Sequence, residues 1–528
     1  MKKKNVSLLF LCMLLSLCLV ACNPSDKGSK PAGEEAEGQM PFLTIGLAEE
    51  SNADKLDATV NDSSMALYGA VYEPLVTYKD GDFHPGVAES WDISEDGKNY
   101  TFHLDKDKLF SDGSPVNAEA VKFTIERAKA LSPDSKLQTL ANLSDISIDD
   151  DYTVSLHFSK ISNQVLNELC QTRPLRVMSP NSVENKSVDG KFKEPIGSGP
   201  FKLSEFSNES ATFVPNENYN KKQPLKYGLI FKTISDGSSR ALALQSGEVD
   251  LIGGLFGRLT PEDLDTFEKA DKFKIYDFKG TESQFLAFNP KNSKLDQKMR
   301  QAISLGIDQD KLSNQKLLGV FQPTVQFAND KNQEAFAYQP DEAKKLIESE
   351  GYKLDQNNIY EKDGQELSFD LVIQTAEFPD WRKKAELIQS QLKEIGVNTN
   401  IQVQEQESYY DTLWTTGKYD LIFFRTYTDG LVPYNFLVSL YQNTDEGSGV
   451  IANDPELSKL IQDFSNLASK EDQQKQMDKI FKMLHDKALG LPINYIGTTL
   501  ATGEKVKSLD YSGLADAPID FNSVELNK

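Results

Sequence analysis

The sequence has little cysteine and little histidine. Of its four cysteines, three fall within the first 22 residues, so Cys170 stands alone in the rest of the chain. The four histidines are scattered singly, and no spacing brings two of them onto one face of a helix. These shortages exclude a disulfide framework and disfavour a bare metal ion held mainly by histidine and cysteine.

Familiar catalytic motifs are also missing. The chain contains no G-x-S-x-G elbow, no P-loop, no H-E-x-x-H and no G-x-G-x-x-G. Pairs of carboxylates do occur, but in a chain with 80 acidic residues a run such as Glu405-Gln406-Glu407 is more readily a solvated face than an acid and base pair. We therefore expect a binding protein and not an enzyme.

Basic residues are fewer than acidic residues. The formal net charge is -23, with 57 basic residues against 80 acidic ones. A chain this acidic is a poor partner for nucleic acid, so we expect no nucleic-acid binding.

The N-terminus has the pattern of an export signal. Lys2 to Lys4 precede an apolar stretch from about Val6 to Val20, which is short for a membrane span. Leu19-Val20-Ala21-Cys22 resembles a lipobox, in which the cysteine thiol accepts a lipid. We predict a lipoprotein signal peptide at residues 1–21 and lipidation of Cys22; an uncleaved anchor and a secreted protein without lipid are the alternatives.

The rest of the chain divides by composition and length. Residues 22–40 are rich in Gly, Pro, Ser and Glu, which predicts a disordered tether. The nearly 490 residues that follow exceed the ~250 to 300 that one hydrophobic core supports, so two lobes are expected. No second apolar stretch reaches membrane-spanning length.

The second half has the pattern of an α/β domain. Apolar residues recur at helical spacing from Trp381 to Ile395, and Gly396 follows as a stop. Residues 397–403 alternate as a strand, and residues 419–424 form an apolar run typical of a buried strand. Helices are also expected at 341–347 and 299–307. Residues 74–214, by contrast, are rich in short strands and turns, for example 100–104 and 152–156.

Many short segments, in order along the chain, resemble family 5 of the bacterial extracellular solute-binding proteins, the peptide and nickel type. They include Tyr72-Glu73-Pro74-Leu75, His84 to Trp91, Phe110-Ser111-Asp112-Gly113, Ile196 to Phe201, Gly247-Glu248-Val249-Asp250, Arg300-Gln301-Ala302-Ile303 and Leu491-Pro492-Ile493. Each segment is weak alone, but their order and spacing in one chain are specific.

This resemblance implies an α/β, two-lobed periplasmic-binding-protein-like fold (type II, cluster C) with an inserted subdomain in the first lobe and a hinge between the lobes. It places lobe I at 41–278, lobe II at 279–501 and a return to lobe I at 502–528, with crossings near Lys279 and Ala501. A solute would be enclosed as the lobes close and then delivered to the permease and ATPase subunits of an ABC importer. A monomer is expected.

Two segments resemble the nickel-chelate and metallophore-binding branch of that family: Thr172 to Arg176 and Phe424 to Tyr427. The resemblance implies that Arg173 and Arg425 hold carboxylates of a small chelator, which a guanidinium grips with two hydrogen bonds. Arg425 also ends an apolar strand, where open α/β sheets place their ligands. A structural ion pair is the alternative role for each arginine, Arg176 included.

Four further residues are candidates for the ligand site: Tyr427, Tyr434, Asn435 and Tyr68. The first three follow the strand on the expected cleft loop, where tyrosine offers a rigid wall and a hydroxyl. Tyr68 lies in a stretch that lines the cleft in relatives, although a core position is the more common role for such a residue. Simple packing is the alternative for all four.

The chain departs from the nickel branch between Leu440 and Ile451, where it has no histidine to bind a metal directly. We therefore predict no cofactor and no direct protein ligand to a metal; any nickel, cobalt or zinc would be carried as a chelate. The alternative ligand is an oligopeptide, bound through backbone hydrogen bonds and an acid for its amine. A signalling receptor would need the same lobe closure and is not distinguished by the sequence.

The lipid anchor can be tested by replacing Cys22 with alanine. Without the thiol no lipid can be attached, so the variant should leave the membrane fraction and appear in the soluble extracytoplasmic fraction. Fractionation followed by immunoblotting measures this. A variant that stays with the membrane would contradict the lipoprotein interpretation.

Overall fold

The computed structural model describes residues 40–48, 53–60, 64–79, 82–219, 223–426, 431–444 and 447–527. Residues 42–528 form one compact unit, separate from residues 1–41. The predicted signal peptide, Cys22, most of the predicted tether and Tyr427 lie outside the described residues. Within the described ranges, no helix is long and apolar enough to cross a membrane.

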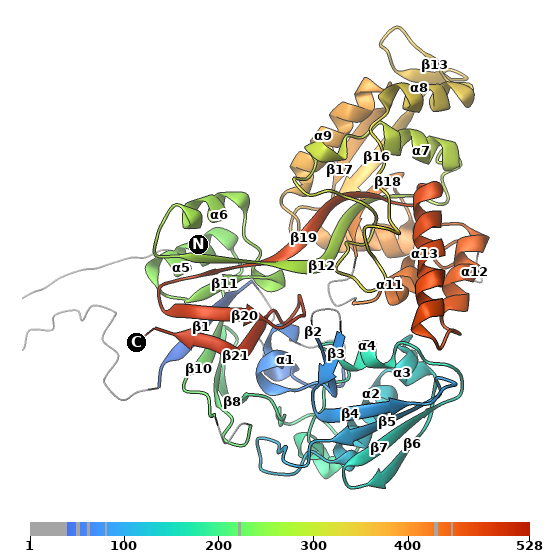
Figure 1. The fold of residues 1–528 in the computed structure, drawn as a ribbon. Coiled ribbons are helices and arrows are strands. Elements are labelled where there is room, and N and C mark those ends of the chain that lie inside the picture. The colour runs from blue at the N-terminus through green and yellow to red at the C-terminus, as the bar shows by residue number, and fades with distance from the viewer. Residues whose placement is uncertain are drawn as a thin grey trace, which may run out of the picture. The chain divides into compact units, whose positions relative to one another are not determined.

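One sheet, ten-stranded over the described residues, passes through both predicted lobes (Figure 1). In spatial order its strands are β17 (Asn398–Val403), β16 (Ser368–Ile373), β18 (Leu421–Arg425), β12 (Lys274–Phe288), β19 (Leu491–Thr502), β11 (Leu251–Gly253), β1 (Phe42–Leu47), β10 (Gly228–Thr233), β9 (Ser210–Pro215) and β8 (Phe201–Phe206). The last five belong to lobe I and the first three to lobe II. The long strands β12 and β19 are shared by both.

The crossing between the lobes is marked by an irregularity in the β12–β19 pair. The register shifts between Phe278, which pairs with Thr498, and Glu282, which pairs with Ile496. Glycines allow the two backbones to approach closely here. A Cβ on Gly280 would lie 2.3 Å from the carbonyl oxygen of Ile496. The shift therefore gives the sheet a local point of flexure.

The shift lies beside Lys279, where the first crossing is predicted. On the other strand, Ala501 pairs with Ile252 of β11 and Ile275 of β12, which places Ala501 within the lobe I part of the sheet. The residue opposite the shift is Gly497, earlier along β19. The remaining lobe bounds stay predictions.

Lobe II contains the helices and strands expected from the periodicity. Strands β17 and β18 run parallel to β16, and helix α9 (Trp381–Glu394) connects β16 to β17. Trp381, Ala385, Ile388 and Leu392 line one buried face of α9, and Gly396 follows with a φ of +79°. Because the three strands are parallel, their carboxyl ends meet at one edge of the sheet.

The other lobe II elements surround this sheet. They are α7 (Gln297–Leu305), η5 (Gln309–Lys311), α8 (Pro340–Ser349), β13 (Lys353–Leu354), β14 (Tyr360–Lys362), β15 (Gln365–Glu366), α10 (Gln406–Asp411), the π-helix η6 (Thr412–Thr416), α11 (Pro433–Leu440), α12 (Pro455–Phe464) and α13 (Lys470–Asp486). The helices expected at 299–307 and 341–347 correspond to α7 and α8.

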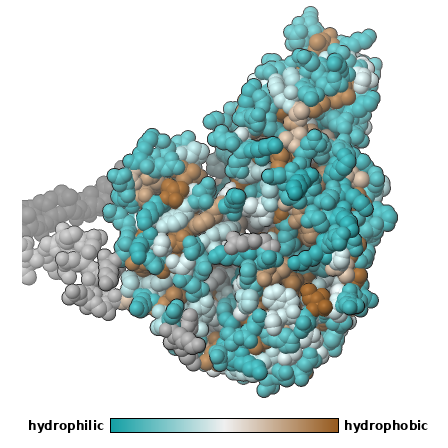
Figure 2. All heavy atoms as spheres, in the orientation of Figure 1, coloured by the Kyte–Doolittle hydropathy of each residue, from teal (hydrophilic) through white to brown (hydrophobic). Residues whose placement is uncertain are grey.

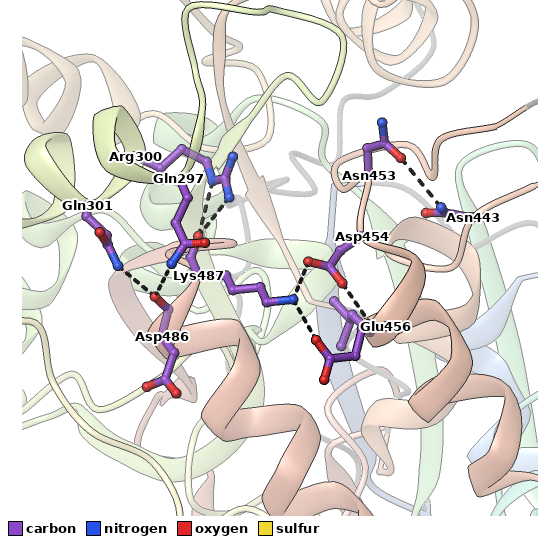
Figure 3. Close-up of polar contacts among 10 residues, drawn as sticks. Gln297, Arg300, Gln301, Asn443, Asn453, Asp454, Glu456, Asp486 and Lys487 are labelled. Carbon is purple, nitrogen blue, oxygen red and sulfur yellow. Dashed lines mark hydrogen bonds and ion pairs between the residues drawn. The ribbon is translucent and has the colours of Figure 1, made fainter. Parts of the chain in front are cut away.

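The Arg300-Gln301 motif of α7 has a structural role (Figure 3). Arg300 donates to the backbone carbonyl oxygens of Lys487 and Ala488. The side-chain amide of Gln301 donates to the backbone carbonyl oxygen of Asp486. These carbonyls lie at the end of α13, where no helical N–H group is available to them. The motif therefore caps α13 and fixes it to α7.

The inserted subdomain consists of a four-stranded sheet, a hairpin, the 14-residue helix α2 and shorter helices. Its elements are β2 (Val76–Lys79), β3 (Asp82–Pro85), β4 (Ala88–Ile93), β5 (Asn99–Leu104), α2 (Ala118–Leu131), α3 (Gln138–Ala141), β6 (Leu143–Asp150), β7 (Thr153–Phe158), α4 (Val165–Leu169), η2 (Pro180–Ser182) and η3 (Glu184–Lys186). The strand-rich character expected for residues 74–214 is confirmed.

Lobe I adds elements from both ends of the chain. They are η1 (Ala53–Lys55), α1 (Met65–Val71), α5 (Gly237–Ser246), η4 (Leu255–Gly257), α6 (Pro261–Glu268), β20 (Val506–Tyr511) and β21 (Ile519–Leu526). Lobe I, lobe II and the subdomain each have a hydrophobic core of their own. The face seen in Figure 2 is mostly hydrophilic, as expected for a chain with this excess of acids.

A buried ion pair joins lobe I to the subdomain. Arg127 of α2 donates to the Asp57 carboxylate at 2.6 Å and to the carbonyl oxygens of Val188 and Gly190. The side chains of Arg127 and Asp57 are 3% and 11% exposed. Removing one partner of such a pair leaves the other charge buried without a partner.

Arg127→Ala should therefore lower the free energy of unfolding by about 3 to 5 kcal/mol, measured by denaturant titration. The control is Arg382→Ala, because Arg382 forms an exposed pair with Glu386 on α9, and such pairs contribute about 0.5 kcal/mol or less. Equal stability of the two variants would contradict the role of the buried pair.

Candidate functional site

A cavity of about 630 Å³ lies where β12 and β19 cross between the lobes. Lobe I contributes residues 254–255 and 258–262 and Leu264, while lobe II contributes the loops 313–315 and 377–380. The two strands contribute the residues on either side of the register shift. Ligand cavities for small solutes fall in this range of volume.

Arg258 lines this cavity. It lies between η4 and α6 of lobe I, and its guanidinium donates to the Glu282 carboxylate of β12 at 2.7 Å. Its Cζ lies 5.4 Å from the centre of the Phe378 ring, in the loop before α9. Because Phe378 belongs to lobe II, Arg258 connects the lobes by an ion pair and a cation–π contact.

Glu377 is the other fixed acid of the cavity wall. Its carboxylate accepts hydrogen bonds from the side chains of Gln374, Gln406 and Tyr410 at 2.6 to 2.8 Å. Three donors, one from the loop after β16 and two from α10, hold the carboxylate in one orientation.

Arg425, the last residue of β18, lies near Glu282 and Glu377. It is half-buried, and it pairs in register with Gln284 of β12. Burial lowers the pKa of Arg425, but the charges of Glu282 and Glu377 and the phenol of Tyr410 outweigh burial and raise it. These surroundings favour a structural role in the network of the cavity wall, the alternative that the sequence left open.

The sheet of lobe II separates Arg425 from helix α11. Neighbouring residues of a strand point to opposite faces. Phe424 packs on Phe285 and on Phe436 of α11, so Arg425 points to the other face. The structure therefore does not place Arg425 on the same side of the sheet as the helix that begins with Tyr434 and Asn435.

A second contact between the lobes forms around Glu168 of α4. Its carboxylate accepts hydrogen bonds from the backbone N–H groups of Gln138 (2.8 Å) and Thr139 (2.7 Å), and also bonds the side chain of Asn435. Tyr434 bonds the side chain of Gln138 and stacks on Phe464. The structure thus brings two of the predicted site residues together against the subdomain.

Arg173 lies in the loop that follows α4. It is half-buried, and the peptide bond between Arg173 and Pro174 is cis. Its neighbour Arg176 is buried and donates to the carbonyl oxygens of Gln171, Cys170 and Tyr72. Burial lowers the pKa of Arg176, and Asp516 acts against this shift. Arg176 therefore shapes the loop that carries Arg173.

Tyr68 is fully buried in α1, and its hydroxyl donates to the carbonyl oxygen of Asp57. Its ring meets Tyr72 edge to face. This position corresponds to the core role weighed for Tyr68 from the sequence. Tyr427 lies outside the described residues, so its place in the site stays a prediction.

Sequence reasoning missed Arg258, Glu282 and Glu377. A signal for Glu282 was present in the pattern: residues 281–284 are four consecutive polar residues that lead into the apolar run 285–288 of one strand. All four are buried. Buried polar residues in a strand mark either a hydrogen-bond network or a ligand. Among the described residues, no group of three or more His, Cys, Asp and Glu side chains is placed to hold a metal ion.

The electrostatics of Glu168 give a pH-dependent prediction. Burial raises the pKa of Glu168 from 4.5 to about 7, against the hydrogen bonds that lower it. At a pH between 4.5 and about 7, Glu168 keeps its proton in the folded chain but has lost it in the unfolded chain. Wild-type stability should therefore fall as pH rises from 4.5 to about 7, by about 3 kcal/mol for this group.

Glu168→Gln should lack this contribution. The difference in melting temperature, wild type minus variant, should be larger at about pH 5 than at about pH 8. Glu119→Gln, on the exposed face of α2, is the control. A difference that is the same at both pH values would show that Glu168 is already ionised at the lower one.

Comparisons with known proteins agree with this architecture. A family model described as "Bacterial extracellular solute-binding proteins, family 5 Middle" matches residues 82–448. The nickel-binding periplasmic protein of Escherichia coli (strain K12) is 30% identical over 486 residues, which is 88% of this chain and 90% of that protein. Heme-binding protein A of Haemophilus influenzae is 28% identical over 90% of this chain and 92% of its own length.

A solved structure of a relative supports the two-lobed fold. The crystal structure of NikA from Brucella suis in complex with Fe(III)-EDTA has a TM-score of 0.82 and 26% identity, and the match covers 92% of this chain and 100% of that one. The protein is therefore a two-lobed extracytoplasmic binding protein of the ABC-importer type, not an enzyme. The chain belongs to family 5 of the bacterial extracellular solute-binding proteins.

Proposed function

We propose that this protein captures a chelated transition-metal ion between its lobes and delivers it to the permease and ATPase subunits of an ABC importer. Nickel is the first candidate, with cobalt and zinc next. The observation that carries the proposal is the polar cavity at the crossing of the two shared strands, in a chain that is 30% identical to a nickel-binding protein over nearly its whole length. That the related NikA holds Fe(III)-EDTA, an intact chelate, supports capture of the metal with its chelator.

The ligand residues belong to this proposal. Arg173, in the loop after α4, would hold a carboxylate of the chelator, because a guanidinium stays charged and bonds carboxylates with two N–H groups. Tyr427, Tyr434 and Asn435 would face the chelator from lobe II. Arg173, Tyr434 and Asn435 do not line the cavity at the strand crossing; Tyr434 and Asn435 lie at the second junction between the lobes, around Glu168. Arg425 would act through Glu282 and Glu377, and Tyr68 through the packing of α1. The chelator, not the protein, would hold the metal.

Attachment to the membrane also belongs to this proposal. A lipid on Cys22 would hold the protein outside the cytoplasmic membrane, beside its permease. Residues 22–40 would then be the tether that lets the two lobes reach the transporter.

The ligand class can be tested by titration calorimetry of the purified protein with free Ni²⁺, nickel with histidine, a metal-loaded metallophore and a mixed peptide pool. Heat with a chelated metal and none with the free ion is the expected result. Heat with peptides alone would assign the chain to the oligopeptide alternative.

Arg173→Ala should weaken binding of the chelate by about 2 to 5 kcal/mol, because the chelator's carboxylate would lose its charged partner. Arg382→Ala, which removes an exposed arginine of α9, should bind as the wild type does. If Arg173→Ala also binds as the wild type does, Arg173 is not part of the site.

A further inference from the structure

Helix α4 and the loop before it hold the subdomain against lobe II (Figure 1). The side-chain amide of Asn163 donates to the carbonyl oxygens of Phe464 (2.8 Å) and Leu467 (3.0 Å), at and just beyond the end of α12. Five residues further along, Glu168 bonds the side chain of Asn435 in α11. Both contacts break when lobe II moves away from the subdomain, so they act as a latch between them.

The two contacts of this latch differ, because Glu168 can ionise and Asn163 cannot. Glu168 is fully buried. Within the subdomain its carboxyl group accepts hydrogen bonds from the backbone N–H groups of Gln138 and Thr139. Its partner in lobe II is the neutral amide of Asn435, which brings no positive charge. Burying an ionised carboxylate in neutral surroundings is costly, so ionisation of Glu168 opposes the contact with lobe II.

Among the described residues around Glu168, no other group changes its charge between about pH 6 and about pH 8. Burial raises the pKa of the three phenols and of the thiol, which therefore stay neutral in this range. Arginine and lysine side chains are charged throughout it. These neighbours are Tyr78 and Lys79 of β2, Tyr100 of β5, Tyr434 of α11, and Cys170, Arg173 and Arg176 at and after the end of α4.

The direction of the effect follows from the burial of Glu168. Burial raises its pKa from 4.5 to about 7, although its hydrogen bonds, including that of Asn435, act the other way. Parting the lobes admits water to the carboxyl group, and water stabilises the ionised form. Between these two pH values the group therefore holds a proton while the subdomain contacts lobe II and loses it when they part. The contact is favoured below about pH 7 and weakened above it.

We propose that protonation of Glu168 controls the contact between the subdomain and lobe II, so that capture of a solute takes up a proton and release of the solute is favoured as the pH rises. The proton uptake rests on the proposed function, because it requires a solute that holds the lobes together. The pH dependence of the lobe contact belongs to the protein alone and can be measured without a solute.

The lobe contact can be measured by the distance between two spin labels in the protein without solute. The labels are attached through Glu119→Cys on α2 and Lys459→Cys on α12, both exposed positions, in the soluble Cys22→Ala chain. The population at the shorter distance should fall from about pH 6 to about pH 8. Glu168→Gln, which stays neutral, should keep the same distribution at both. A wild-type distribution that does not change with pH would overturn the inference.

The coupling to a solute can be measured by calorimetry with nickel–EDTA, a chelate that does not titrate in this range and whose iron(III) counterpart is held by the related NikA. With pKa values of 4.5 and about 7, the wild type should bind about 10-fold more tightly at pH 6 than at pH 8. Comparing buffers of different ionisation enthalpy should show uptake of about one proton at pH 6 and almost none at pH 8. This measurement needs no variant.

Two variants separate protonation from the loss of a contact. Glu168→Gln should bind nickel–EDTA equally, within about twofold, at the two pH values. Asn163→Ala is the matched control, since it removes the neutral contact of the latch. It should bind about 5- to 10-fold more weakly at both pH values and keep the pH dependence of the wild type.

The outcomes distinguish this inference from the proposed function. Equal binding of nickel–EDTA by the wild type at both pH values, or a Glu168→Gln variant that keeps the 10-fold difference, would overturn the proton-dependent latch and leave metal-chelate capture standing. A wild type that binds no chelate but whose label distances change with pH, and do so only when Glu168 is present, would end the proposed function and keep the latch.

Discussion

The pairing of β12 with β19 is the constraint on which the rest of the structure depends. Ten strands of the described chain form one sheet, but these two alone extend from lobe I into lobe II. Any change in the angle between the lobes must be absorbed near the register shift, where Gly280 and Gly497 allow close backbone approach. The cavity lies at this same point, so residues beside the register shift also line the space between the lobes.

The same strand also carries the polar groups of the site. Residues 281–284 enter the sheet as buried polar side chains, where apolar ones would cost less. A network of polar contacts stabilises them. Ser283 accepts a hydrogen bond from Gln322, Glu282 pairs with Arg258, and the charges of Glu282 and Glu377 act on Arg425.

The contact around Glu168 gives the lobes a second junction, remote in sequence from the hinge. Helix α11 presents Tyr434 and Asn435 to Gln138 and Glu168 of the subdomain. Because Asn435 bonds a carboxyl group whose pKa burial raises to about 7, this junction couples lobe contact to protonation. Leu431, which precedes α11, also packs into the hydrophobic core of the subdomain. The subdomain therefore contacts lobe II directly and forms part of the junction between the lobes.

Local pattern in the sequence determined the helices and strands, because periodicity depends only on neighbours along the chain: α7, α8, α9, β17 and β18 all lie where spacing predicts them. The order of short motifs determined the family, and with it the two lobes. The tertiary structure alone decided which side chains meet. Arg425 and Phe424 are adjacent in sequence, yet strand geometry sends them to opposite faces of the sheet. Arg258 and Glu282 are 24 residues apart and meet only because β12 passes beside η4 and α6. A local sequence pattern cannot predict a contact between two residues that lie so far apart in the chain.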